Sequence, residues 1–177
     1  MSEKKNNKNT IVKTTIILVV DDIPIVRDGV AQLINLEADL VVSAKAGNIA
    51  EAVKAVKKQR IDLALVDMLL KNETGVQVTK KIKALYPNLI VLIFSMSDNP
   101  QYVKQAFEAG ASGYILKDEL SEKIVIAIRQ VLQGKVYLSK RLAENFPNIK
   151  LKGDKFSLNK AKNKYERIYT NGLLDCK

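Results

Sequence analysis

Histidine is absent from this chain of 177 residues, and several kinds of site are excluded with it. Without an imidazole the protein has no Ser-His-Asp triad, no histidine-ligated metal site and no internal phosphohistidine. The single cysteine, Cys176, has no partner for an intramolecular disulfide, which is typical of a protein of the reducing cytoplasm. Carboxylates, hydroxyls and lysines therefore remain the main groups available for chemistry.

Long apolar runs are also missing. The first ten residues, MSEKKNNKNT, carry charge and asparagine instead of the apolar stretch of a signal peptide. The longest apolar stretch near the start, Ile16–Val20, is far too short to span a membrane. We therefore expect a cytoplasmic protein without a membrane partner. An apolar fraction of 47% is enough for a core, and the length suits one domain with a small appendage.

Acidic residues are scarce only at the two ends of the chain. The formal charge is +10, of which residues 1–13 hold +3 and residues 139–177 hold +6. Residues 14–138 carry 15 basic and 14 acidic side chains, which is typical of a balanced globular domain. We interpret 1–13 as a basic, disordered N-terminal tail and 139–177 as a basic linker or tail. Such tails contact nucleic-acid phosphates or simply solvate a disordered segment, and the composition leaves both readings open.

Short apolar, β-branched runs alternate with segments that have helical spacing. Ile124, Ala127, Ile128 and Val131, for example, recur at offsets 0, 3, 4 and 7 before a stop at Gly134. Strands alternating with helices predict a five-stranded parallel sheet of the doubly wound α/β class, covered by helices on both faces. The five predicted strands are Thr15–Val20, Leu40–Ala44, Ile61–Val66, Leu89–Ser95 and Ser112–Leu116.

Polar side chains follow four of these strands. Asp21 and Asp22 follow the first strand, Asp67 the third, Ser95 the fourth and Lys117 the fifth. Each residue alone has an ordinary explanation as a helix cap or a solvated charge. Because ligands of doubly wound sheets bind outside the carboxyl ends of the strands, the five together predict a functional site at that edge.

Clustered carboxylates repel one another and resist burial unless a cation accompanies them. Mg²⁺ prefers carboxylate oxygens and usually shares its ligand shell with a phosphate. The pattern therefore predicts phosphate chemistry, with Asp67 as a nucleophile that forms an aspartyl-phosphate. Lys117 and the metal would neutralise the transferring phosphoryl group, and Ser95 would donate a hydrogen bond to one of its oxygens.

Four motifs resemble the receiver domain of two-component response regulators. They are VDD at 20–22, VDM at 66–68, FSMS at 94–97 and GASGYILKD at 110–118, and the resemblance covers about residues 14–138. It implies a (βα)5 flavodoxin-like receiver fold. It also implies that Asp67 accepts a phosphoryl group from a cognate sensor histidine kinase. Mg²⁺ would be held by Asp22, Asp67 and the backbone carbonyl of Leu69, with Asp21 helping directly or through water.

The resemblance further implies a switch and an output. Ser95 and Tyr114 are similar to the family's switch pair, and phosphorylation would change the output face and drive homodimer formation. The sequence departs from the usual pattern at Lys71 and Asp118, where many members have proline. Both departures are typical of the branch that carries a LuxR/NarL-type helix-turn-helix, which implies transcription regulation without enzymatic turnover beyond self-phosphorylation and self-dephosphorylation.

The last 39 residues, 139–177, do not match a complete DNA-binding domain. An independent domain usually needs at least about 50 residues. LSKRLAENF predicts one short helix, and SLNKAKNKYERIYTNG at 157–172 predicts a second, in which Tyr165 and Tyr169 either stack on bases or form a marginal amphipathic helix. We therefore expect an incomplete or absent helix-turn-helix, as in a truncated or frameshifted member of that branch.

Three alternatives remain beside a phosphorylated transcription regulator. One is a DNA-binding regulator whose basic tail supplies the contacts, and another is a stand-alone receiver that acts only through protein–protein contacts. The third is a hydrolase with an aspartate nucleophile and Mg²⁺. Such phosphatases usually need a second acid two residues after the nucleophile, where this chain has Leu69. A nucleotide-binding protein is disfavoured because no glycine-rich phosphate loop is present.

Overall fold

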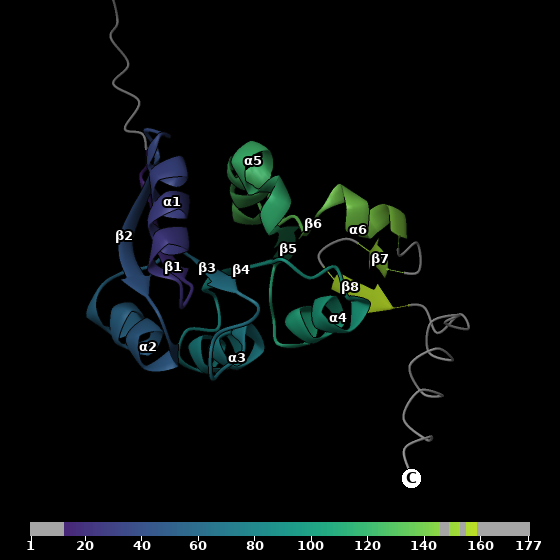
Figure 1. The fold of residues 1–177 in the computed structure, drawn as a ribbon, viewed down its shortest axis with the longest axis horizontal. Helices are drawn as coiled ribbons and strands as arrows, with labels where there is room; N and C mark the ends of the chain where they lie inside the picture. The colour runs from purple at the N-terminus through teal and green to yellow at the C-terminus, as the bar shows by residue number, and fades with distance from the viewer. Residues whose placement is uncertain (1–12, 146–148, 153–154, 159–177) are drawn as a thin grey trace, which may run out of the picture.

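The computed structural model describes residues 13–145, 149–152 and 155–158 (Figure 1). The predicted N-terminal tail, apart from Lys13, lies outside the described residues. The same holds for most of the second predicted C-terminal helix, including Tyr165 and Tyr169. Within the described part of the chain, no helix has the length and apolar character needed to cross a membrane.

A parallel sheet of six strands in the order β2-β1-β3-β4-β5-β6 forms the centre of the molecule. The predicted doubly wound α/β fold is thus confirmed. The expectation of five strands was wrong by one, since β6 pairs with β5 at the sheet edge through only two residues, too few to produce a periodic pattern. The strands are β1 (Thr15–Val20), β2 (Leu40–Ala46), β3 (Leu63–Asp67), β4 (Ile90–Ser95), β5 (Gly113–Leu116) and β6 (Tyr137–Leu138).

Five α-helices connect the strands and cover both faces of the sheet. Figure 1 shows α1 and α5 on one face and α2, α3 and α4 on the other. A short 3₁₀ turn at Lys117–Glu119 leads into the last of them. The helices are α1 (Pro24–Asn35), α2 (Ile49–Lys58), α3 (Gly75–Leu85), α4 (Pro100–Glu108) and α5 (Leu120–Leu132).

Local sequence explains where several helices begin and end. Pro24 and Pro100 stand in the first helical turn, where the missing N–H costs nothing. Thr74 and Gln77 form a capping box at the start of α3. Gly110 and Gly134 have φ angles of +97° and +78° just after α4 and α5, so the stop predicted at Gly134 is confirmed and Gly110 ends α4 in the same way.

The apolar core lies in two layers, one on each face of the sheet. Neighbouring residues of β1 point to opposite layers: Val19 packs under α1 and α5, whereas Val20 packs towards α2 and α3. All five residues of β3 are buried, as expected for a central parallel strand. The carboxyl ends of β1, β3 and β5 therefore lie between two packed apolar layers.

The segment after β6 forms one helix, α6 (Lys140–Asn145), and an antiparallel hairpin of β7 (Ile149–Lys152) and β8 (Lys155–Leu158). The helix predicted in LSKRLAENF is therefore confirmed. The helix predicted to begin at Ser157 was wrong at its start, because the last two residues of β8, 157–158, pair with β7 instead. No helix-turn-helix occurs in the described part of this segment.

Helix α6 is attached firmly to the receiver-like core. Leu142 is fully buried within the core layer that lies towards α4. The hydroxyl of Ser139 accepts a hydrogen bond from the backbone N–H of Leu116 at 2.9 Å, and Arg141 pairs with Asp118 at 2.6 Å. Asp118, singled out in the sequence because proline often stands there, thus joins α6 to the end of β5.

Candidate functional site

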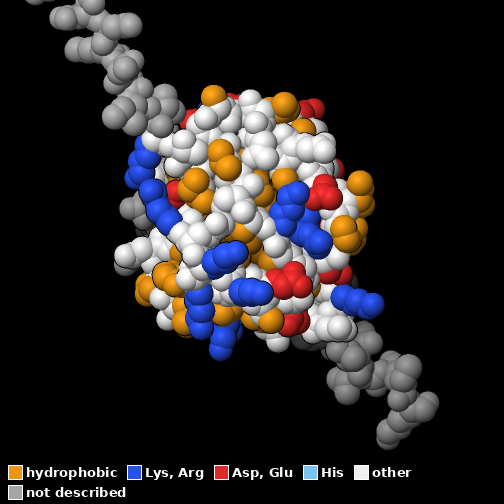
Figure 2. Space-filling model, turned by 90° about the vertical axis from the view of Figure 1, so that its left-hand side faces the viewer, with side chains coloured by type: hydrophobic (Ala, Val, Ile, Leu, Met, Phe, Trp, Pro, Cys, Tyr) orange, Lys and Arg blue, Asp and Glu red, His pale blue; other side chains and the backbone are white. Residues whose placement is uncertain are grey.

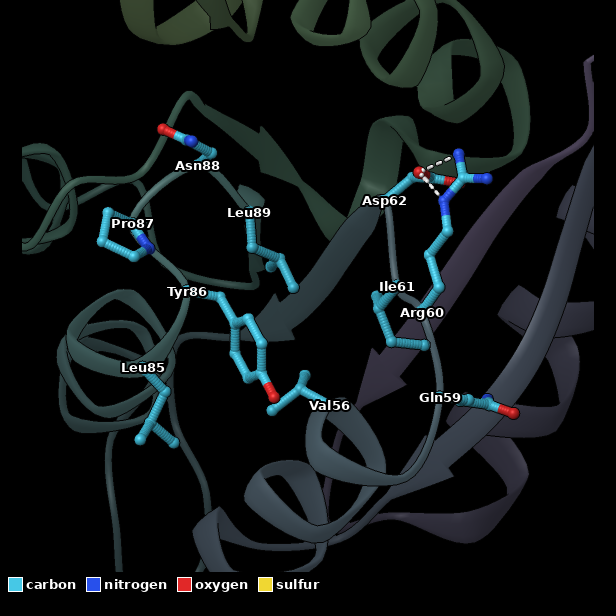
Figure 3. A pocket seen from close by; sticks show the side chains of 10 residues that line it. All are labelled: Val56, Gln59, Arg60, Ile61, Asp62, Leu85, Tyr86, Pro87, Asn88 and Leu89. Carbon is cyan, nitrogen blue, oxygen red and sulfur yellow. Dashed lines mark hydrogen bonds and ion pairs between the residues drawn. The ribbon is translucent and has the colours of Figure 1, made fainter.

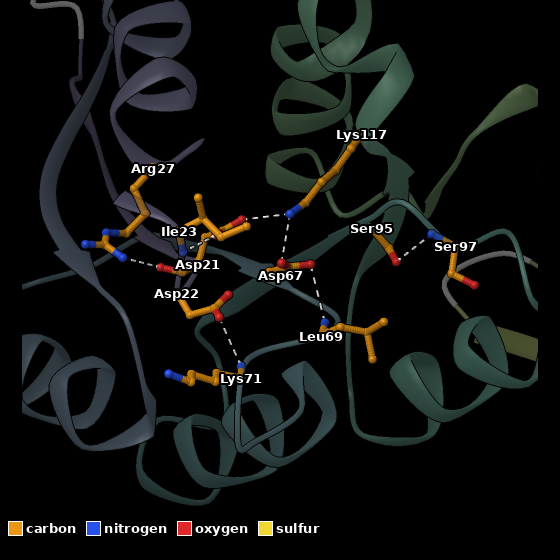
Figure 4. Close-up of polar contacts among 10 residues, drawn as sticks. All are labelled: Asp21, Asp22, Ile23, Arg27, Asp67, Leu69, Lys71, Ser95, Ser97 and Lys117. Atoms are coloured by element: carbon orange, nitrogen blue, oxygen red, sulfur yellow. Dashed lines mark hydrogen bonds and ion pairs between the residues drawn. The ribbon is translucent and has the colours of Figure 1, made fainter. Parts of the chain in front are cut away.

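Four of the predicted polar residues converge at the carboxyl edge of the sheet (Figure 4). Asp21 and Asp22 follow β1, Asp67 is the last residue of β3, and Lys117 follows β5. Because β1, β3, β4 and β5 are consecutive in the sheet, residues up to 96 positions apart in the chain become neighbours. The structure therefore assembles the edge constellation that the sequence predicted.

Lys117 is the electrostatic centre of this group. Its ammonium donates to Asp21 Oδ2 and to Asp67 Oδ2, both at 2.8 Å, and lies 4.7 Å from the centroid of the Phe94 ring. Asp21 is fully buried and Asp67 is only 5% exposed. One cation thus compensates two carboxylates that water barely reaches.

Burial raises the pKa of Asp67 from 3.8 to about 6. The hydrogen bond and charge of Lys117 oppose this rise, while the neighbouring charge of Asp21 adds to it. Burial also works against the charge of Lys117, but its hydrogen bonds to Asp21 and Asp67 outweigh burial and raise the pKa of the ammonium. Asp67 is therefore an ionised, weakly solvated carboxylate at neutral pH, and gains a proton as the pH falls through about 6.

The carboxylates offer oxygens to a hard cation. One oxygen each from Asp21, Asp22 and Asp67 lies within 4.8 Å of the others. Asp22 is more exposed than the other two. Leu69, whose carbonyl is a metal ligand according to the family resemblance, lies two residues after Asp67 in the chain. Its N–H donates to Asp67 Oδ1 at 3.3 Å. A partly open, all-oxygen donor set fits a divalent cation such as Mg²⁺ that keeps some of its water.

Backbone and side-chain contacts hold the acidic loop in place. Asp21 Oδ1 accepts from the N–H of Ile23 at 2.8 Å, and Arg27 of α1 donates to the carbonyl of Asp21. Asp22 Oδ2 accepts from the N–H of Lys71 at 3.1 Å, which links the loops after β1 and β3. Sequence reasoning missed Arg27, because nothing local marks a helical arginine as a partner of a carbonyl behind it.

Gly75, the first residue of α3, is the second component that sequence reasoning missed. Its N–H donates to the carbonyl of Met68 at 2.9 Å. A Cβ atom at this position would lie only 2.3 Å from the carbonyl oxygen of Asp67. Helix α3 therefore begins in backbone contact with the site, and only a residue without a side chain permits this approach.

The predicted pair Ser95 and Tyr114 meets at a third residue, Ser97. Ser95 Oγ accepts from the N–H of Ser97 at 3.0 Å, and the hydroxyl of Tyr114 donates to the carbonyl of Ser97 at 2.8 Å. Burial raises the pKa of the fully buried Tyr114 to about 12, so the phenol remains a donor at physiological pH. The loop after β4 thus connects the site edge with β5.

Comparison with known proteins identifies the same architecture. The family model of the response regulator receiver domain matches residues 17–129. The oxygen regulatory protein NreC of Staphylococcus epidermidis is 33% identical over 133 residues, which are 75% of this chain and 61% of that protein. The uncharacterized transcriptional regulatory protein YxjL of Bacillus subtilis is 33% identical over 135 residues, 73% of this chain and 62% of that protein. The chain thus spans about three fifths of the length of these relatives.

Two solved structures of response regulators are similar to this chain in fold and in sequence. A LuxR-family two-component response regulator from Aurantimonas superposes with a TM-score of 0.72 at 33% identity, over 75% of this chain and 94% of that one. The receiver domain of the putative response regulator NarL from Mycobacterium tuberculosis gives a TM-score of 0.65 at 31% identity, over 70% of this chain and 99% of that one.

Proposed function

This chain belongs to the response regulator receiver domain family, a family of regulatory domains, and from that premise we propose that Asp67 is its phosphoacceptor. A cognate sensor histidine kinase would supply the phosphoryl group. The observation that carries the proposal is the contact of Asp67 with Lys117 beside two further carboxylates. A hydrolytic role has less support, because Leu69 stands where a phosphatase of this type would need a second acid.

In the transfer step, a carboxylate oxygen of Asp67 forms a bond to phosphorus. The bond between phosphorus and the donor nitrogen breaks, and the leaving imidazole keeps the electron pair and takes a proton. Asp21, Asp22, Asp67 and the carbonyl of Leu69 would hold Mg²⁺. The bound ion supplies neutralisation of the phosphoryl charge. Lys117, which now donates to Asp67 Oδ2, would donate to a phosphoryl oxygen once Asp67 is modified.

The switch would run through the loop after β4. If the hydroxyl of Ser95 turns to a phosphoryl oxygen, its contact with the N–H of Ser97 is lost. The carbonyl of Ser97 is the acceptor of the Tyr114 hydroxyl, so a shift of Ser97 that follows this loss would also break the hydrogen bond of the ring. We infer that this couples Asp67 to the face formed by α4, β5 and α5, where homodimer formation would follow.

For the whole protein we propose transcription regulation in the cytoplasm. YxjL, named as a transcriptional regulatory protein, supports this reading. We assign residues 14–138 to the receiver unit and 139–177 to a basic linker segment. A gel-shift assay on this chain tests the alternative in which the basic tail contacts DNA. A steep loss of affinity with added salt would favour phosphate contacts by that tail.

The direct test is chemical phosphorylation. Incubation with acetyl phosphate and Mg²⁺ should add about 80 Da to the intact mass, as expected for one phosphoryl group on a carboxylate. Chelation of Mg²⁺ with EDTA should suppress the adduct, and size-exclusion chromatography should show dimers in the phosphorylated sample. A folded, Mg²⁺-binding protein that never gains the adduct would contradict the proposal.

Phosphorylation should slow down in acid. Because burial raises the pKa of Asp67 to about 6, the protonated, non-nucleophilic form accumulates as the pH falls below that value. At a fixed Mg²⁺ concentration too low to fill the site, so that Asp67 is mostly free of metal before labelling, the initial rate at pH 5 should be about tenfold lower than at pH 7. Saturating Mg²⁺ should reduce this dependence, because a bound cation favours the ionised carboxylate. Phosphoramidate serves as a second phosphoryl donor, because it ionises differently from acetyl phosphate. A decrease in rate seen with both donors therefore reflects titration of the protein and not of the donor. A rate that stays level across this range would show that Asp67 is already ionised at pH 5.

Leu69 should prolong the phosphorylated state. Its side chain is 48% exposed beside Asp67 and has no polar atom with which to orient an attacking water. Changing Leu69→Asn should speed loss of the phosphoryl group by about tenfold, the scale of one well-placed positioning contact. Leu36→Asn, at another exposed leucine, is the control and should leave the lifetime unchanged. Equal lifetimes in wild type and Leu69→Asn would remove Leu69 from this role.

A further inference from the structure

A groove opens at the end of the molecule opposite Asp67 (Figure 3). It has a volume of about 540 Å³ and lies between the C-terminal ends of α2 and α3, where β3 and β4 begin. It takes no part in the phosphate chemistry. The lining residues are Val56, Gln59, Arg60, Ile61, Asp62, Leu85, Tyr86, Pro87, Asn88 and Leu89.

This groove has an apolar floor and mixed walls. Its polar lining residues are Gln59, Arg60, Asp62 and Asn88, and Arg60 forms an ion pair with Asp62. Val56, Ile61 and Leu89 are buried and form its floor, whereas Leu85 and Tyr86 are each 40% exposed. Figure 3 shows the Tyr86 ring reaching across towards Val56, with Leu85 beside it. Two partly exposed apolar side chains over an apolar floor offer a seat for one apolar side chain of a partner.

The two helices beside the groove carry an excess of basic side chains. The helices on its two sides carry five exposed lysines, and none of these forms an ion pair within the described part of the chain. Helix α3 contains no acidic residue, and the only one in α2, Glu51, lies in its first turn, away from the groove. In the lower half of Figure 2, which shows the side of the molecule that carries α2, blue side chains lie among orange ones, with red side chains beside them. The lysines are Lys54, Lys57, Lys58, Lys80 and Lys81.

Charge decides which partner fits. The chain's own ends, 1–13 and 139–177, are both basic, and a second copy carries +10, so neither complements this surface. Duplex DNA offers phosphates but no apolar side chain for the space between Leu85 and Tyr86. We propose that the groove binds an acidic segment of another protein, with one apolar side chain seated in it and carboxylates facing the lysines. This binding is independent of phosphorylation at Asp67.

The probe is a fluorescein-labelled peptide of aspartate and glutamate with a single central leucine, and its binding to the full chain is measured by fluorescence anisotropy. Leu85→Ala combined with Tyr86→Ala should weaken binding by about tenfold or more, as loss of anchor contacts does. Lys57→Glu combined with Lys58→Glu should weaken it by a similar factor and flatten its salt dependence. Replacing the peptide leucine with serine should reproduce the loss caused by the Leu85 and Tyr86 changes.

Matched controls separate the groove from total charge and from the switch. Lys123→Glu with Lys135→Glu makes the same charge change elsewhere and should leave affinity nearly unchanged, as should Leu36→Ala and Asp67→Asn. Circular dichroism verifies folding of each variant. Equal weakening by both charge pairs would overturn the proposal. The proposal would also be overturned if random-sequence duplex DNA bound more tightly than the peptide and its affinity were unchanged by Leu85→Ala with Tyr86→Ala. The lysines would then form a nucleic-acid binding surface.

Discussion

Asp67→Asn should leave no phosphoryl adduct after treatment with acetyl phosphate and Mg²⁺. The amide has nearly the same size as the carboxylate but lacks the anionic oxygen that attacks phosphorus. Asp21 and Asp22 are unchanged in this variant, but both follow β1. Only Asp67 ends β3, which lies between β1 and β4 in the sheet, so we do not expect either of the other two to replace it. We expect the labelled fraction to fall by about a hundredfold or more, to background, by intact-mass measurement.

The same variant should be folded, so that a missing adduct is informative. The folded-state pKa of Asp67 is raised from 3.8 to about 6. The ionised carboxylate is therefore less favourable in the folded state than in the unfolded state, and the wild type loses stability as the pH rises through this range. Asparagine carries no such charge, and at pH 7 without metal we expect Asp67→Asn to unfold at no lower denaturant concentration than the wild type. Asp28→Asn, at an exposed aspartate paired with Lys45, is the labelling control. An adduct that persists in Asp67→Asn would move the phosphoacceptor elsewhere.

Gly75→Ala should cost far more stability than a methyl group added at Gly29, the other glycine within the helices that the structure describes. The new Cβ would lie 2.3 Å from the carbonyl oxygen of Asp67 and 3.0 Å from Cα of Met68. Both obstacles are backbone, so no side-chain rotation relieves the overlap. Helix α3 or the end of β3 must shift, and we expect a loss of about 3 kcal/mol in the free energy of unfolding. Chemical denaturation followed by circular dichroism measures it.

Gly29→Ala is the matched control. Gly29 lies exposed within α1, and a Cβ there meets no atom within 4 Å. Alanine should therefore stabilise that helix by about 0.5–1 kcal/mol, since glycine is the poorer helix former. Because Gly75 lies close to the backbone of Asp67, the proposed phosphoacceptor, Gly75→Ala should also slow labelling by acetyl phosphate, whereas Gly29→Ala should not. Similar stabilities of the two variants would contradict the close approach.

The sequence by itself determined the fold class and the candidate site residues. Hydrophobic runs and helical spacing are local signals, and they located five strands within a few residues and indicated helices between them. Parallel strands then place their carboxyl ends on one edge, so topology alone brought Asp21, Asp67 and Lys117 together without any contact being known. The motif GASGYILKD added the branch of the family, which the relatives support.

Only the tertiary structure decided the contacts between elements. Strand β6 is too short to carry a period, and it forms because β5 offers it an open edge. Arg27 and Gly75 act through backbone atoms that packing brings near, and no residue pattern encodes such a distance. The groove beside Leu85 and Tyr86 exists because two helix ends, separate in sequence, stop short of covering the same floor. Local periodicity specifies elements, whereas close approach depends on how those elements pack.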